Sequence, residues 1–180
     1  MRRKKGIKIR KIIIGVMGGG EIDDLIDYEI ARKLGYLIAK EGWILLNGGR
    51  ASGMMEASAR GAKEGDGLTI GILPGDNSSW ASEYIDIPIL TGIGFARNYI
   101  NVQTSEVVVA LPGKTGTISE IALALNIGKK VISLNFDLGT LFKKYTEDGQ
   151  LIYVKKPEEV IVLIKNLLNK KNNKEMKDYV

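Results

Sequence analysis

The chain contains neither cysteine nor histidine among its 180 residues. Without cysteine it forms no disulfide, offers no thiolate nucleophile and binds no zinc through sulfur. Without histidine it has no imidazole base, no Ser-His-Asp triad and no histidine-ligated metal. Any chemistry therefore uses carboxylates, lysine, arginine, tyrosine, hydroxyl groups and backbone amides, and no spacing of residues predicts a metal site.

Long hydrophobic runs are also missing. The apolar run at residues 12–16 is too short for the core of a signal peptide. No segment is long enough to cross a bilayer as a helix. We therefore expect a cytoplasmic protein that does not associate with membranes.

The net charge of +5 is unevenly distributed. Residues 1–11 carry +7 and residues 165–180 carry +3, which leaves −5 on residues 12–164. An acidic body with basic ends is a poor platform for nucleic acid, so we expect no nucleic-acid partner. Binding of nucleic acid through residues 1–11 is the last of three functional hypotheses. The distribution predicts a basic flexible N-terminus at 1–11, one domain at 12–169 and a polar tail at 170–180.

Apolar runs alternate with helical patterns along the chain. The runs predict strands at 12–17, 43–46, 68–73, 107–111, 130–134 and 151–154, with a short extended piece at 85–90 and an irregular stretch from 135 to 149. Helical periodicity marks residues 21–41 and 54–64, the surroundings of Arg97, and the stretches that follow Thr117 and Pro157. This alternation predicts an α/β fold, with a doubly wound, mostly parallel sheet that has helices on both faces, in one Rossmann-like domain.

Glycine-rich turns follow several of the predicted strands. Because the carboxyl ends of parallel strands share one edge, these turns are expected to converge there, where such sheets bind ligands. Free backbone N–H groups at a helix start favour an anion, most simply a phosphate. The candidate phosphate-binding residues in these turns are Gly18, Gly19, Gly48, Gly49, Ser52, Gly53, Gly113, Lys114, Thr115, Gly116 and Thr117.

Several of these residues also have a purely structural interpretation. The glycines at 18–20 are as typical of a tight turn as of a ligand contact. Ser52 is a suitable N-cap for the following helix, and Lys114 suits a solvated loop. Neither of two familiar nucleotide motifs fits: a Walker A sequence would need glycine at Val108, and the first strand is not followed by Gly-x-Gly-x-x-Gly.

Three further polar residues are candidates for the same edge of the sheet. Arg97 is placed to hold a phosphate through its guanidinium, with Asn98 beside it, and a surface ion pair is the structural alternative. Glu120 has two interpretations. The sequence Thr-Ile-Ser-Glu at 117–120 matches a capping box, and its spacing favours that role over a carboxylate at the rim that assists proton transfer.

Four motifs taken in order resemble the LOG superfamily, and most closely its branch of molybdenum-cofactor-carrier-like and uncharacterised proteins. These motifs lie at residues 47–57, 71–75, 96–98 and 112–120, and the likeness covers about residues 12–135. The resemblance implies a Rossmann-like homo-oligomer, either a dimer or a tetramer. Nothing in the sequence indicates a pyridoxal-phosphate site, so a lysine decarboxylase is not expected.

The resemblance implies two alternative functions. LOG enzymes are phosphoribohydrolases that cleave the N-glycosidic bond of nucleoside 5′-monophosphates, and in that case Arg97 and Glu120 are the catalytic residues. The chain departs from their motif because Lys114 replaces its second glycine and Asn98 replaces a lysine. Carrier-like members instead bind a pterin-type phosphorylated cofactor without turnover, which is the function we expect. The partner is then a phosphorylated small molecule: no cofactor is required, but a nucleotide, a phosphate or a pterin-type cofactor is expected to bind.

Overall fold

The computed structural model describes residues 11–22 and 24–177, with side chains up to Lys170. The predicted basic terminus therefore lies almost wholly outside the described residues. The strands are β1 (Ile13–Met17), β2 (Ile44–Asn47), β3 (Thr69–Leu73), β4 (Ile87–Leu90), β5 (Val107–Ala110), β6 (Val131–Leu134) and β7 (Leu151–Val154). The helices are α1 (Leu25–Lys40), α2 (Gly53–Glu64), the 3₁₀ helix η1 (Gly94–Ala96), α3 (Arg97–Thr104), α4 (Thr115–Asn126), α5 (Lys143–Glu147) and α6 (Pro157–Lys177).

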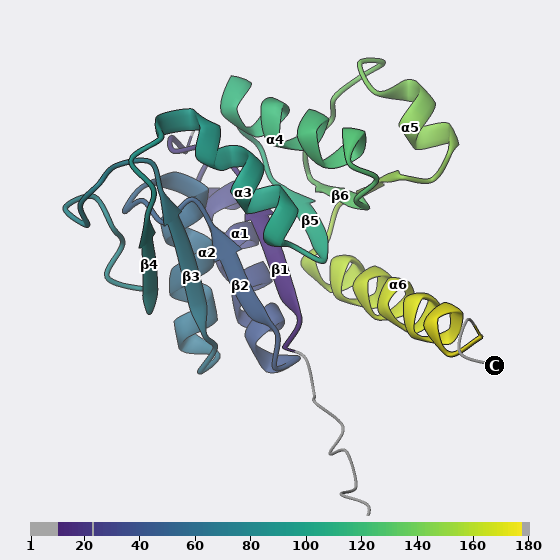
Figure 1. Ribbon diagram of the computed structural model, residues 1–180, viewed down its shortest axis with the longest axis horizontal. Coiled ribbons are helices and arrows are strands. Elements are labelled where there is room, and N and C mark those ends of the chain that lie inside the picture. Colours follow the sequence, from purple (N-terminus) through teal and green to yellow (C-terminus); the bar gives the residue numbers. More distant parts are fainter. Residues whose placement is uncertain (1–10, 23, 178–180) are drawn as a thin grey trace, which may run out of the picture.

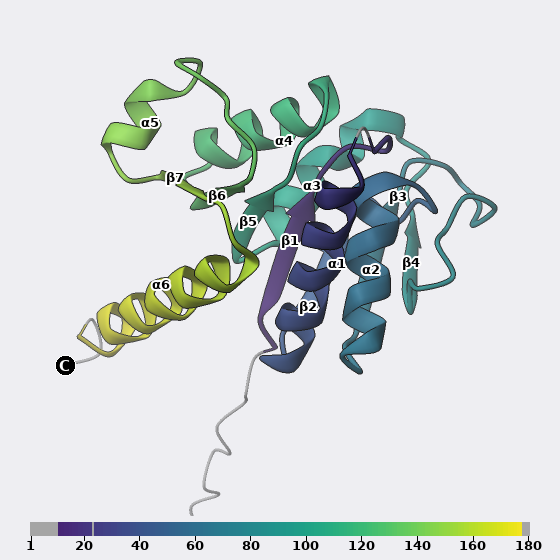
Figure 2. The same cartoon turned by 180° about the vertical axis from the view of Figure 1, so that it is seen from behind.

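The described strands form one parallel sheet in the order β4-β3-β2-β1-β5-β6-β7. Helices α1, α2 and α6 cover one face, and α3, α4 and α5 lie on the other (Figures 1 and 2). The predicted doubly wound, Rossmann-like fold is confirmed. None of the described helices is long and apolar enough to cross a membrane.

The strands are apolar throughout because both faces of the sheet are covered. In β5, Val107 and Val109 belong to the core under α1, α2 and α6, whereas Val108 and Ala110 belong to the core under α3 and α4. Alternate side chains of a strand point to opposite faces, so a strand between two helical layers needs apolar residues at every position.

The structure differs from the sequence-based element bounds in four places. Helix α1 begins at Leu25 rather than near residue 21, because Asp24 caps it by accepting a hydrogen bond from the Ile26 N–H (2.8 Å). The extended piece at 85–90 contains the edge strand β4, and α5 lies within the stretch expected to be irregular. Helix α6 continues to Lys177, into the residues for which a polar tail is predicted.

The crossover direction reverses between β1 and β5. From β1 the chain builds the sheet outward through β2, β3 and β4, and it then returns to place β5 on the other side of β1. The loops after β1 and β5 therefore leave toward opposite faces, and a crevice opens between them. The fold alone thus fixes where a ligand site is expected.

Candidate ligand-binding site

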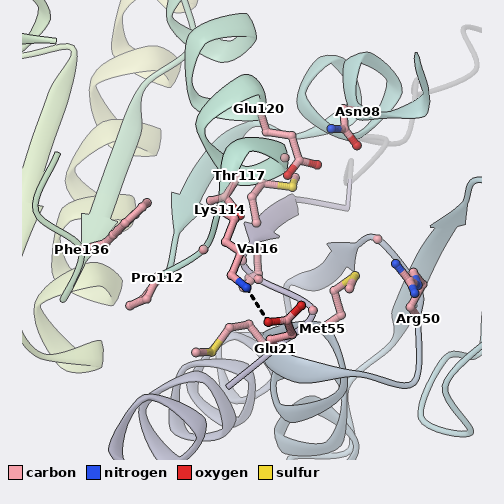
Figure 3. A pocket seen from close by; sticks show the side chains of 18 of the residues that line it. Val16, Glu21, Arg50, Met55, Asn98, Pro112, Lys114, Thr117, Glu120 and Phe136 are labelled. Carbon is pink, nitrogen blue, oxygen red and sulfur yellow. Dashed lines mark hydrogen bonds and ion pairs between the residues drawn. The ribbon is translucent and has the colours of Figure 1, made fainter. Parts of the chain in front are cut away.

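A cleft of about 360 Å³ opens at this reversal point. Its walls come from the loops after β1, β2 and β5, from η1 and α3, from the start of α4, and from Phe136 after β6. The volume is in the range of small-ligand pockets. Figure 3 shows Lys114 and Thr117 in the middle of the cleft, with Phe136 and Arg50 at its two sides.

Most of the predicted site residues meet in this cleft, and four do not line it. Those that line it are Gly18, Gly19, Gly48, Arg97, Asn98, Gly113, Lys114, Gly116, Thr117 and Glu120. Gly49, Ser52, Gly53 and Thr115 lie outside its lining. The two loops predicted to hold phosphate, after β2 and after β5, therefore reach the same rim of the sheet.

The start of α2 is covered by main chain. The Met54 N–H donates to the Gly19 carbonyl (2.9 Å), and a side chain at Gly53 would overlap the backbone of Gly19 and Gly20. Ser52 is the N-cap residue, as predicted, but its hydroxyl makes no capping hydrogen bond. One of the amides available at this helix start is therefore already used within the protein.

The start of α4 is open to the cleft. Gly116, in its first turn, has no atom within 4 Å of the position that a Cβ would occupy. Gly113 is packed so closely against Thr117 that a side chain there would overlap the threonine hydroxyl. The Gly19 N–H donates to the Pro112 carbonyl (3.0 Å) and joins the loops after β1 and β5. The first amides of α4 have no acceptor within the helix, so this end of the cleft suits an anion.

Arg97 is the first residue of α3 and is only 8% exposed. Its Nε and Nη1 have no hydrogen-bond partner among the described residues. Gly48 makes room for the guanidinium, since a Cβ there would lie 2.5 Å from Nη1. Burial lowers the pKa of Arg97, an effect that the Glu120 carboxylate opposes and Arg50 reinforces. The alternative interpretation of Arg97, a surface ion pair, is excluded by its burial: this arginine is a buried cation that lines the cleft.

Glu120 is buried, and its carboxylate is bonded to a neighbouring helix rather than to the start of its own. Asn101 Nδ2 donates to Glu120 Oε1 (2.7 Å), so the carboxylate contacts α3. The favoured capping-box interpretation is wrong, because α4 begins at Thr115, with Lys114 as its N-cap residue and no side-chain cap. Burial raises the pKa of Glu120 to about 7, while the hydrogen bond from Asn101 and the charge of Arg97 act in the opposite direction. A group with such a pKa can give or take a proton near neutral pH.

Asn98 and Lys114 hold neighbouring elements in place around the cleft. Asn98 Nδ2 donates to Ser119 Oγ (3.2 Å), and Ser119 Oγ donates to the Gly116 carbonyl (2.7 Å), which ties α3 to the first turns of α4. Lys114 forms an ion pair with Glu21, so the loop after β5 is joined to the loop after β1 (Figure 3). The Lys114 ammonium lowers the pKa of Glu21 through a hydrogen bond and its charge.

Other residues that line the cleft were missed by sequence reasoning. Glu21, Asp27, Phe95 and Phe136 belong to this group. Phe136 could have been found from the sequence. It comes two residues after a predicted strand, and ligand contacts are common at the carboxyl ends of strands in such sheets. No group of three or more acidic side chains able to hold a metal ion occurs in the described part of the chain.

Together, the fold and the cleft define a Rossmann-like α/β protein with a candidate small-ligand cleft at its topological switch point. The family model described as the SLOG cluster4 family matches residues 11–161. The chain therefore belongs to the SLOG cluster4 family, which confirms the resemblance drawn from its motifs.

The chain is similar to three proteins whose names state a function. The chain is similar to the molybdenum cofactor binding protein from the phototrophic bacterium Rippkaea orientalis, with 49% identity and a TM-score of 0.84 over 89% of this chain and 99% of that one. It is also similar to the molybdenum cofactor carrier protein from Chlamydomonas reinhardtii, with 42% identity and a TM-score of 0.82 over the same shares. A cytokinin riboside 5′-monophosphate phosphoribohydrolase from Mycobacterium tuberculosis is 33% identical over 95 residues, which are 52% of this chain and 51% of that protein.

Proposed function

We propose that this protein binds a nucleotide-like phosphorylated ligand, of the pterin-cofactor type, and holds it without chemical change. The observation that carries the proposal is the buried Arg97 guanidinium, whose Nε and Nη1 have no partner among the described residues. A buried charge without a hydrogen-bonded counterion is costly, so such a group is retained where an anion completes it. A phosphate matches a guanidinium in both charge and geometry.

The start of α4 supports the same ligand. Gly116 and Thr117 line the cleft and present helix-start amides, and no side chain of Gly116 blocks the approach. Phosphate at this position would be held by Arg97 from one side and by the amides from the other. The relatives that bind or carry the molybdenum cofactor cover nearly the same length as this chain, which supports a pterin-type ligand here.

A test of the carrier proposal is to identify what the protein retains. We expect native mass spectrometry of freshly purified protein to show a bound phosphorylated heterocycle that is released on denaturation. The matched variant Arg97→Met should be purified empty. Purification of the wild-type protein free of any phosphorylated compound, together with no binding of added nucleoside monophosphates, would contradict the proposal.

A phosphoribohydrolase is the second candidate, and Glu120 is the observation that favours it. Its buried carboxyl has a pKa of about 7 and lies in the field of Arg97, so it could protonate a leaving base or activate water next to a bound ribose phosphate. Incubation with AMP separates the two functions. Release of adenine that disappears in Glu120→Gln would favour the hydrolase, and AMP recovered intact after binding would favour the carrier.

The proposal includes assembly into a homo-oligomer, a dimer or a tetramer, as the family resemblance implies. It includes no nucleic-acid partner. Light scattering tests the first point, because a monomer mass at working concentration would contradict it. Binding to DNA that persists in a variant without residues 1–11, and that weakens steeply with salt, would contradict the second.

A further inference from the structure

The side of the cleft opposite Arg50 has a different chemical character from the rest. Phe136 lies at this side of the cleft and Arg50 at the other (Figure 3). Asp27 and Arg97 also line the cleft: Asp27 is hydrogen-bonded to Asn135, the neighbour of Phe136, and Arg97 lies within the electrostatic influence of Arg50. A carboxylate repels a phosphate and arginines attract it. This polarity orients a ligand that has a phosphate at one end and an uncharged ring at the other.

Hydrogen bonds fix the turn that carries Phe136 and join it to Asp27 in the first turn of α1. Asn135 Nδ2 donates to Asp27 Oδ1 (2.8 Å), a contact between residues 108 apart in the sequence, and the Asn135 N–H donates to the Val154 carbonyl (2.9 Å). The buried Ser133 Oγ donates to the Phe136 carbonyl (2.6 Å). Asn135 adopts a left-handed backbone conformation, with φ of 50°. Such conformations outside glycine cost energy and are often found at binding sites.

Asp27 differs from the other carboxylates in the cleft. Three carboxylates of the described residues line the cleft: Glu21, Asp27 and Glu120. Glu21 forms an ion pair with Lys114, and Glu120 accepts a hydrogen bond from Asn101 on α3. Among the described residues, Asp27 accepts a hydrogen bond from the neutral amide of Asn135, which occupies one of the several lone pairs of a carboxylate. Both Asp27 and Phe136 line the cleft.

We propose that this end of the cleft binds the ring of the ligand and selects a 2-amino-4-oxopyrimidine ring, the structure that guanine and pterins share. Asp27 accepts the ring N–H and the exocyclic amino group, which are two adjacent donors, while Phe136 contacts the ring face. Adenine presents an acceptor beside its donor on this edge and is disfavoured, because the acceptor faces the carboxylate. Hypoxanthine keeps the ring N–H but lacks the amino group. This inference rests on the proposed phosphate site.

The test is calorimetric binding of GMP, IMP and AMP, which share one ribose phosphate. We expect the wild-type protein to bind GMP about tenfold more tightly than IMP and more tightly still than AMP, since a hydrogen bond to a charged group carries that much discrimination. Asp27→Asn keeps an oxygen for Asn135 and should remove the preference for GMP. Asp137→Asn, in the same loop but outside the cleft lining, is the matched control and should keep it.

The remaining outcomes separate the ring site from the phosphate site. Phe136→Leu should weaken all three nucleotides about tenfold and leave binding of inorganic phosphate unchanged. Equal wild-type affinities for the three nucleotides, or a GMP preference that survives in Asp27→Asn, would overturn the ring assignment and leave the phosphate proposal standing. Failure of all three nucleotides and of phosphate to bind would overturn both.

Discussion

Arg97 and Glu120 place two groups of opposite charge, both largely buried, in the lining of one cleft. Each is less than a tenth exposed, and each departs from its ordinary pKa in the direction that reduces its charge. Their attraction opposes these shifts without removing them. Because buried charged groups are destabilising unless they are fully paired, we expect this site to lower the stability of the ligand-free protein in exchange for binding.

Replacement of Arg97 by methionine tests directly whether this residue lowers stability and supports binding. Arg97→Met removes a buried charge and keeps much of the side-chain volume, so the urea midpoint of the ligand-free protein should not fall. Binding of AMP should be lost. A clear decrease in the midpoint would show that Arg97 is a structural residue with satisfied contacts, contrary to the role given to it here.

The pKa of Glu120 predicts how stability depends on pH. Its folded-state pKa of about 7 lies above the ordinary glutamate value of 4.5, so the folded protein holds this proton more tightly than the unfolded chain does. The stabilisation is therefore complete below about pH 4.5 and is lost as the pH rises to 7. Glu120→Gln should flatten this pH dependence and raise the free energy of unfolding above pH 7 by up to about 3 kcal/mol. Parallel curves for the two proteins across pH 5–8 would contradict the shift.

A substitution at Gly116 is expected to weaken phosphate binding without lowering the stability of the fold. Gly116→Ala adds a methyl group where no atom lies within 4 Å, in a helix that favours alanine. We expect an unchanged or slightly higher unfolding midpoint and a phosphate affinity reduced about tenfold or more. Unchanged affinity would place the phosphate away from the start of α4.

At the scale of elements, α1 and α2 cross with almost no space between their backbones. A side chain at Gly61 would overlap the Arg32 carbonyl of α1, and one at Gly35 would overlap the Ser58 carbonyl of α2. This close crossing brings the start of α2 under the loop after β1, where the Gly19 carbonyl accepts the Met54 N–H. The packing of the two helices thus sets one wall of the cleft.

Gly61→Ala should therefore destabilise the fold despite the better helix propensity of alanine. We expect a loss of about 1–3 kcal/mol, since the helices must separate to admit the methyl group. Gly116→Ala is the matched control, because it makes the same substitution in a helix without a clash. Equal urea midpoints for the two variants would show that the α1–α2 crossing adjusts at little cost.

The sequence predicted the elements better than their ends. The buried strands were predictable because apolar runs covered on both faces are distinctive, and Pro157 marked the first residue of α6. The start of α1 was placed too early, because residues 21–24 continue the helical pattern but Asp24 caps the helix. That difference leaves Glu21 in a loop at the mouth of the cleft, where its pairing with Lys114 was not predicted.

For the whole molecule, the strand order explains why separate motifs form one site. The loops after β1 and β5 are 90 or so residues apart in sequence, and they meet because β1 and β5 are adjacent in the sheet. Convergence was predictable from parallel topology. The orientation of Glu120 was not predictable from the sequence. Whether its carboxylate bonds to the start of α4 or to Asn101 on α3 depends on how these two helices pack.

A crystal structure of the protein with bound GMP tests the phosphate site and the ring site together. We expect the phosphate to contact the Arg97 guanidinium and the amides of Gly116 and Thr117, with the base beside Phe136. A phosphate bound elsewhere, with Arg97 contacting only water or protein, would contradict this expectation.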